Sequence, residues 1–333
     1  MPVAIDEIIT AAHYESLRVK VARIYGVPSG TWTTGSIGTT AGYNQTTLAL
    51  PRVPGDMITA EDWNTLRHGV ICSYTHIVGN APTNPAIPEV TPDICGENQG
   101  DQILAKIYND METVQNFNTI NRNTVAATQK SLSTATVGRL TDTWNGKQTH
   151  AFNMIFEDKN HKEGFFNAGG SLRFSTSAAY GGSAAKSIDW ATIGNQFGLI
   201  EIKNMSIEGS GPGQILIPQG GTFNGWWYIN SLALDTPEVI YAITGADIPG
   251  YPQYDENYAH IQVTKKSDTR FVFEVIFNDA DSGDKTGLGA AVDENVETDI
   301  TSTVQVFTPS GDCVSLPVPQ FTEKTPENTF DYN

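Results

Sequence analysis

The residues whose types and spacing could bind a metal form an acidic segment in the last quarter of the chain. Asp279, Asp281 and Asp284 surround Gly283 after a run of apolar residues that ends at Phe277. Alternating carboxylates ahead of a glycine are typical of the start of a calcium-binding loop, because hard oxygen ligands must converge on one cation. Such a twelve-residue loop closes on a glutamate, but here its last position is Ala290. The pattern therefore favours a solvated turn between strands, with the three aspartates as weak calcium candidates.

Histidines and glycine-rich segments are the next places where chemistry could occur. His68 and His76 lie near Cys72 and could share a helix face as metal ligands, but surface or interface histidines are the favoured interpretation. The sequence contains no His-Glu-x-x-His motif, and the Gly209–Gly213 segment lacks the Gly-Lys-Ser/Thr ending of a phosphate loop. No strand-turn-helix context supports a nucleophilic serine. We therefore expect no catalytic residues, no cofactor and no enzymatic activity.

An aromatic cluster could recognise carbohydrate. It comprises Trp226, Trp227 and Tyr228, with Tyr241, Tyr251, Tyr254 and Tyr258 further along the chain. Exposed Trp and Tyr rings stack on sugar faces, which makes a glycan contact at Trp226, Trp227 and Tyr228 a hypothesis. Packing in a core or an interface is the commoner use of such residues and is favoured.

Two segments near the N-terminus share one helix-start sequence. Ile9–Arg18 reads Ile-Thr-Ala-Ala-His-Tyr-Glu-Ser-Leu-Arg, and Ile58–Arg67 reads Ile-Thr-Ala-Glu-Asp-Trp-Asn-Thr-Leu-Arg. A Thr hydroxyl at the start of each copy can cap the first turn. Apolar residues then recur at i, i+3 and i+7, which predicts one buried stripe per helix. The repeat predicts a built interface, either between helices or between subunits, anchored by Tyr14, Leu17, Trp63 and Leu66.

A third helix is predicted from Asp101 to about Leu132, where the chain has no Gly or Pro. Residues at heptad spacing form a seam that is apolar at first and polar in the middle: Leu104, Ile107, Met111, Val114, Asn118, Asn121, Val125, Thr128 and Leu132. Two interpretations stay open, an amphipathic helix lying on its own domain or an oligomerisation helix. In the second, Leu104, Ile107, Met111 and Val114 join the assembly interface.

The hydrophobic period changes to two after Trp144. Apolar residues alternate with polar ones around Phe152, Leu172, Ile200, Phe273 and Val304, with turn residues between the segments. Short strands in this order predict an antiparallel β-sandwich. The expected fold class is therefore α+β: an N-terminal helical region at 1–98 with a repeated helix motif, a long helix within 99–140, and a C-terminal β-sandwich at 141–333.

Composition limits the partners. The 333 residues carry a net charge of −17 with only 20 Lys and Arg, which argues against nucleic acid and anionic membrane as partners. No apolar run approaches the roughly 20 residues that cross a bilayer, and Asp6 and Glu7 replace the basic start of a secretory signal. Synthesis in the cytoplasm is expected. The three cysteines are predicted to be reduced thiols, with a Cys72–Cys95 bridge as the alternative.

Several sequence motifs, taken together, resemble those of a known protein family. They are the repeated helix start, Gly42-Tyr43-Asn44-Gln45, the segment from Phe165 to Phe174 (Phe-Phe-Asn-Ala-Gly-Gly-Ser-Leu-Arg-Phe), and Asp293-Glu294-Asn295-Val296 followed by Thr301-Ser302-Thr303-Val304. In this order they resemble virion structural proteins, related to tails or tail fibres, of tailed phages that infect cyanobacteria. That family shows Gly-Tyr-Gly-Gln where this chain has Asn44, and it supplies no catalytic residues.

The resemblance implies a structural virion protein in the tail, baseplate or fibre attachment region. Its expected partners are other virion proteins and copies of itself in a homo-oligomer, and its expected location is the virion, after synthesis in the host cytoplasm. The alternatives are a receptor- or carbohydrate-binding module that contacts a host surface glycan, and a neck or capsid-decorating protein. A cell-wall hydrolase explains least, since no carboxylate pair or metal triad is apparent.

Overall fold

The computed structural model describes residues 9–25, 52–56, 58–90, 105–122, 124–140, 143–179, 185–203, 207–209, 214–215, 232–247, 254–280, 295–314, 316–324 and 327–330. The chain folds into two compact units that are not contiguous in sequence. The first unit comprises residues 1–131, 160–170 and 308–317, and the second comprises residues 132–159, 171–307 and 318–333. These units differ from the three contiguous segments expected from the sequence.

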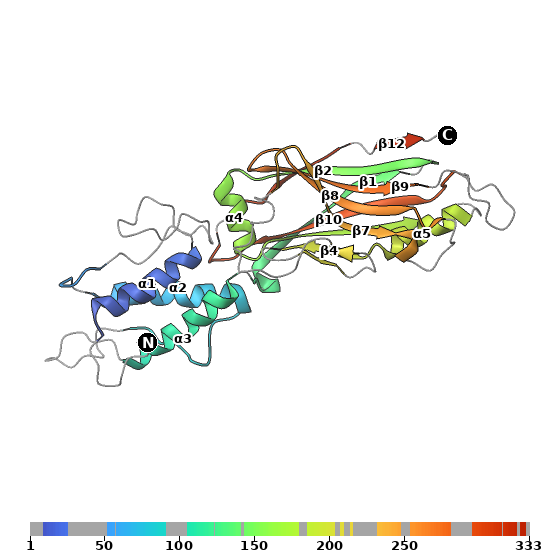
Figure 1. The fold of residues 1–333 in the computed structure, drawn as a ribbon. Coiled ribbons are helices and arrows are strands. Elements are labelled where there is room, and N and C mark those ends of the chain that lie inside the picture. Colours follow the sequence, from blue (N-terminus) through green and yellow to red (C-terminus); the bar gives the residue numbers. More distant parts are fainter. Residues whose placement is uncertain are drawn as a thin grey trace. The chain divides into compact units, whose positions relative to one another are not determined.

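Three helices that contact one another pairwise build the first unit: α1 (Ala11–Tyr25), α2 (Ala60–Val78) and α3 (Ala105–Asn121), shown in blue to green in Figure 1. Helix α2 begins with a capping box, in which the Thr59 hydroxyl accepts from the Asp62 N–H and the Asp62 carboxylate accepts from the Thr59 N–H. It ends at Gly79, whose φ of 97° is the left-handed conformation that glycine adopts most readily. Helix α4 (Lys159–Asn167) adds most of its length to this unit.

Two antiparallel sheets build the second unit (Figure 1). The first sheet has the order β1-β10-β3-β4-β5, formed by β1 (Lys130–Leu140), β10 (Asp299–Pro309), β3 (Ser171–Ala179), β4 (Leu199–Ile202) and β5 (Ile207–Gly209). The second has the order β11-β2-β9-β8-β7-β6, with β12 also pairing with β2. Its strands are β11 (Gln320–Glu323), β2 (Gly146–Ile155), β9 (Arg270–Asn278), β8 (Tyr258–Lys265), β7 (Pro237–Thr244), β6 (Gln214–Ile215) and β12 (Glu327–Phe330).

The inner faces of the two sheets meet through phenylalanine rings. Phe152 of β2 stacks on Phe273 of β9 with centroids 5.3 Å apart, and Phe174 of the other sheet lies 5.5 Å from both. Alternate residues of a strand point to the same side, and β10 has one buried face over most of its length. Strands β2 and β9 bury residues of both faces. Helix α5 (Ala185–Gln196) contacts β3 of one sheet and β8 of the other.

The fold class expected from the sequence is wrong. Helices α4 and α5 lie between strands, so short helices are spread through the chain instead of forming a helical region followed by a long helix and an all-strand sandwich. The predicted helix from Asp101 to Leu132 is not present as one element: α3 ends at Asn121, a short 3-10 turn covers Ala127–Gln129, and strand β1 starts at Lys130.

Polar side chains explain why α3 ends where it does. The Asn121 amide donates to the Phe117 carbonyl, and the Thr124 hydroxyl donates to the Asn121 carbonyl. These bonds satisfy carbonyls that have no partner at the end of a helix. The Ser- and Thr-rich residues that follow favour an extended strand over further helical turns. None of the helices in the described ranges is long and apolar enough to cross a membrane.

Candidate functional site

The residues predicted to form an assembly interface lie in the core of a single chain. Seven of them are at most 5 % exposed and belong to the same hydrophobic cluster: Tyr14, Leu17, Trp63, Leu66, Ile107, Met111 and Val114. Leu104 lies outside the described residues. Buried side chains cannot contact a second copy, so the interface that the repeat builds is between helices, and the assignment of these residues to a contact between subunits is corrected.

The structure also reveals a third copy of the repeat, in α3. Ala105-x-x-Tyr108-x-x-Met111 matches Ala11-x-x-Tyr14-x-x-Leu17 and Ala60-x-x-Trp63-x-x-Leu66, and each helix begins at that alanine. Sequence reasoning missed this copy because Leu104 replaces the capping Thr and Glu112 replaces the closing Arg. The shared signal is an aromatic residue three positions after the first alanine of the helix.

The three repeat aromatics meet one another. Tyr14 and Trp63 pack edge to face with centroids 5.1 Å apart, and Trp63 and Tyr108 do so at 6.4 Å. Such arrangements bring the positive ring edge to the negative face and are favourable beyond the area they bury. Burial raises the pKa of Tyr108 to about 12 and also raises that of Tyr14, so both phenols are neutral at ordinary pH.

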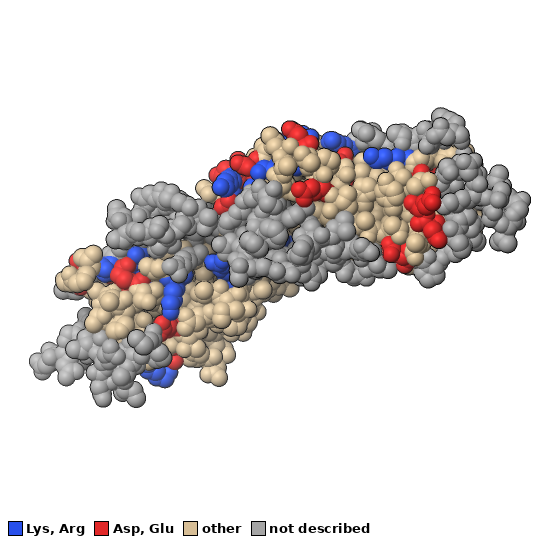
Figure 2. All heavy atoms as spheres, in the orientation of Figure 1, with Lys and Arg blue, Asp and Glu red and all other residues tan. Residues whose placement is uncertain are grey.

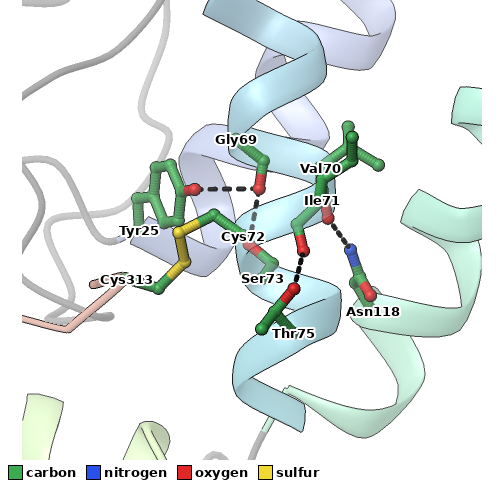
Figure 3. Close-up of a disulfide and its surroundings, with 9 residues drawn as sticks. All are labelled: Tyr25, Gly69, Val70, Ile71, Cys72, Ser73, Thr75, Asn118 and Cys313. Carbon is green, nitrogen blue, oxygen red and sulfur yellow. Dashed lines mark hydrogen bonds between the residues drawn. A yellow bond between two sulfur atoms is a disulfide. The ribbon is translucent and has the colours of Figure 1, made fainter. Parts of the chain in front are cut away.

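Further along the three helices, the residues at equivalent positions of the repeat also correspond to one another. The next equivalent residues, all buried, are Leu17, Leu66 and Met111, then Val21, Val70 and Gln115, then Ile24, Ser73 and Asn118. The deeper layers therefore become polar on α2 and α3. The Asn118 amide donates to the Val70 carbonyl at 2.9 Å, which joins α3 to α2 (Figure 3). A directed hydrogen bond of this kind selects one register between two helices, which apolar contacts alone do less well.

A disulfide joins α2 to a distant segment. Cys72 and Cys313 are bonded, with Cα atoms 5.5 Å apart and 241 positions between them in sequence. Figure 3 shows the bridge beside Tyr25, whose hydroxyl donates to the Gly69 carbonyl at 2.8 Å. The expectation of reduced thiols, and the alternative Cys72–Cys95 bridge, are both corrected by this pairing; Cys95 lies outside the described residues.

The two histidines proposed as a metal pair differ in environment. His68 is exposed, whereas His76 is fully buried and its Nε2 lies 2.8 Å from the Ala168 carbonyl. Burial lowers the pKa of His76 to about 4, so the ring is neutral and donates this hydrogen bond. His76 therefore fixes the Ala168 backbone, and no group of three metal-ligating side chains occurs in the described parts of the chain.

The calcium candidates are only partly described. Asp281 and Asp284 lie outside the described residues, and Asp279 pairs with Lys186, with Nζ 2.7 Å from Oδ2. Both side chains are fully buried. An ammonium group already lies against this carboxylate, so Asp279 is corrected from a calcium candidate to one half of a buried ion pair.

The structure likewise describes only some of the aromatic residues proposed for glycan binding. Trp226, Trp227, Tyr228 and Tyr251 lie outside the described residues. Tyr241 and Tyr254 are fully buried, and the Tyr241 hydroxyl donates to the Phe197 carbonyl at 2.8 Å. These two rings are part of the core, which leaves them no access to a sugar.

Charged side chains are spread thinly over the face that Figure 2 shows. Among the described residues that Figure 2 shows, acidic and basic side chains lie in small groups with uncharged side chains between them. Pairs such as Lys266 with Asp235 and Lys106 with Asp110 neutralise part of the positive charge. A phosphate backbone is bound by clustered positive charge, and the described residues on this face show no such cluster.

The second unit also buries other aromatic and charged side chains, some of them on α5, which carries Lys186, and on β9, which precedes Asp279. Trp144 and Trp190 are both fully buried with centroids 4.9 Å apart, and Trp190 lies 6.3 Å from Phe277. Asp189, one helical turn after Lys186 on α5, is only 4 % exposed.

No protein-family model, curated protein or solved structure matches this chain.

Proposed function

We propose that this protein is a structural component of a tailed-phage virion, in the tail, baseplate or fibre attachment region, and that it acts through contacts with other virion proteins and with copies of itself. The observation that carries the proposal is the Cys72–Cys313 disulfide. Disulfides persist outside the reducing cytoplasm, and virions are one of the settings in which they do so. The phrases that resemble phage virion proteins point to the same setting.

The segment from Phe165 to Phe174, one of the motifs that resemble virion proteins, has a role in folding. Phe165 and Phe166 at the end of α4 are buried, and Gly169 follows with a φ of +88°. A Cβ on Gly170 would lie 2.5 Å from the Phe165 carbonyl oxygen, so only glycine fits there. This motif therefore forms the turn from α4 into β3, and the turn accounts for its phenylalanine and glycine residues. This supports a likeness of fold to the virion proteins that carry the phrase.

The helical core supports a structural role in a second way. Three copies of one helix motif meet through Tyr14, Trp63 and Tyr108, and the disulfide ties α2 to the segment after β10. A cross-linked core resists unfolding, which suits a protein that must survive outside cells. We propose that the protein has no catalytic turnover and that its outer surfaces carry the contacts with partners.

The redox state of the bridge tests this proposal. Samples of infected cells before lysis and of particles purified after release would be denatured without reductant and their free thiols alkylated, and the peptides that contain Cys72 and Cys313 would then be quantified by mass spectrometry. We expect both cysteines to resist alkylation in released particles until a reductant is added. A Cys313→Ser chain is the matched control, since its Cys72 must be alkylated in every sample. Recovery of the protein only outside particles, or with both thiols reactive in them, contradicts the proposal.

A further inference from the structure

We infer that Lys186 and Asp279 join in an intramolecular isopeptide bond that cross-links helix α5 to the end of strand β9. The inference goes beyond the virion assignment and does not depend on it. Nζ of Lys186 lies 2.7 Å from Oδ2 of Asp279. Because Cγ is bonded to that oxygen, the nucleophile and the carbon it would attack are within roughly 4 Å, close to the approach that a bond-forming step requires.

The environment favours the reactive, uncharged forms of both groups. Both side chains are fully buried, and two buried charges lose hydration that their mutual attraction repays only in part. Transfer of one proton from Lys186 to Asp279 removes both charges and leaves an amine beside a carboxylic acid.

The surroundings exclude water, which would otherwise reverse or compete with the reaction. Trp144 and Trp190 are fully buried and in edge-to-face contact, and Phe277 packs on Trp190. Amide formation releases water, so a dry site moves the equilibrium toward the bond.

Hydrogen bonds hold the chain in place at Asp279 and at Ser187, the residue after Lys186. The Asp279 N–H donates to the Gly146 carbonyl at 2.6 Å, and the next N–H, of Ala280, donates to the Asn257 side chain. On the other side, the Ser187 hydroxyl accepts from the Glu297 N–H, and the Ser187 carbonyl accepts from the Thr298 hydroxyl. The two reacting atoms therefore meet without a search of conformations, which is the main requirement for an uncatalysed intramolecular reaction.

The reaction balances without any added reagent. The neutral Nζ attacks Cγ of protonated Asp279, and the C–N bond forms as the carbonyl π electrons move to oxygen. A proton then passes from Nζ to the hydroxyl oxygen, the C–O bond breaks, and water leaves. Lysine and aspartate are replaced by one amide and one water, with no change of oxidation state.

Asp189 is placed to move the proton. It lies one turn after Lys186 on the same helix face and is buried with it. A carboxylate there can accept a proton from the attacking nitrogen and return it to the leaving oxygen, as a general base and then a general acid. It is a second buried carboxyl group, three residues after Lys186 on α5, and we assign it this relay.

The intact mass of the full-length chain tests the inference. We expect the reduced, purified protein to be lighter than its sequence by one water. Trypsin should fail to cleave after the acylated Lys186, and tandem mass spectrometry should find the Lys186 and Asp279 peptides joined. The exposed pair Lys266 and Asp235 is an internal control, because its N–O distance of 2.8 Å is similar but water keeps both groups charged; it should give ordinary peptides. An uncross-linked mass with cleavage after Lys186 overturns the inference, as does a water loss that maps elsewhere.

Variants separate the chemistry from folding. Asp279→Asn should form the same amide by losing ammonia, and its product should have the same mass as the wild-type product. Lys186→Arg should keep its full mass. Asp189→Asn should slow the reaction by roughly tenfold or more, so that freshly made protein contains both masses. An Asp279→Asn chain that folds, as judged by its circular dichroism, yet keeps its full mass contradicts the inference, and so does an unslowed Asp189→Asn chain.

Discussion

The indole of Trp63 meets the ring of Tyr14 edge to face, with centroids 5.1 Å apart and ring planes at 89°. The two residues hold the same position in two copies of one helix motif, and Tyr108 holds it in a third copy. Each helix therefore supplies one aromatic residue to a common contact. The motif is explained by packing within the chain, and a partner must bind elsewhere.

Loss of one of these aromatic residues should destabilise the first unit strongly. We expect Tyr108→Ala to lower the free energy of unfolding by about 3 kcal/mol or more, because it removes a buried ring and leaves a cavity beside Trp63. Ile120→Ala on the same helix is the control; Ile120 is 78 % exposed, so its change should stay within about 0.5 kcal/mol. Urea titrations of the two variants measure the difference. Equal effects would contradict the packing described.

Acid should destabilise the protein through two buried histidines. Burial lowers the pKa of His76 and of His150 from 6.5 to about 4. The unfolded chain therefore binds more protons than the folded chain between these values, so stability is present above pH 6.5 and is lost as the pH falls toward 4. The loss should reach about 3 kcal/mol per histidine.

Substitution separates this effect from general acid lability. His150→Gln should flatten the pH dependence of the free energy of unfolding, whereas His68→Gln, at an exposed position, should leave it unchanged. Unfolding in urea at several pH values provides the measurement. A His150→Gln chain with the wild-type slope would show that the imidazole is not buried in its neutral form.

Reduction should weaken the first unit. The Cys72–Cys313 bond closes a long loop, and its removal by Cys72→Ser should cost about 3–5 kcal/mol through the greater freedom of the unfolded chain. Differential scanning calorimetry with and without reductant gives the comparison. The wild type should lose thermal stability on reduction and the Cys72→Ser chain should not. A wild-type protein indifferent to reductant would argue against the bridge.

Strands β1 and β2 approach each other closely at Gly138, so we expect a larger residue at this position to be destabilising. A Cβ there would overlap the ring of His150, whose Nδ1 is 2.7 Å from the Ser302 hydroxyl. Gly138→Ala must displace this ring, at a cost of about 1–3 kcal/mol. Thr136→Ser, at an exposed position of the same strand, should change stability by no more than about 0.5 kcal/mol. Thermal denaturation that shows no difference between these variants would contradict the contact.

Local signals in the sequence predicted part of the fold. The Thr at the start of the second repeat predicts a capped first turn, and Thr59 does cap α2 in the structure. The reciprocal bond from the Thr59 N–H to Asp62, which completes a capping box, was not predicted. The alternation around Val304 predicts a strand with one buried face, which β10 shows over most of its length. Strands β2 and β9, around Phe152 and Phe273, are instead buried on both faces over most of their length.

Other features depend on contacts that local sequence does not contain. The end of α3 at Asn121 is made by side-chain hydrogen bonds, and the absence of Gly and Pro from Asp101 to Leu132 concealed it. The partner of Cys72 lies 241 positions away. The pairing of Lys186 with Asp279 likewise requires the fold, since neither neighbourhood in the sequence indicates the other.

The proposed role in a virion can be checked most directly by quantitative mass spectrometry of gradient-purified particles from the source of the sequence, if that source is a phage. Peptides of this protein would be counted against those of the major tail and capsid proteins across the gradient. We expect the protein to sediment with infectious particles at a constant ratio to the tail proteins and to remain after a high-salt wash. Its absence from the particle peak, or a ratio that falls to zero on washing, would contradict a structural role in the virion.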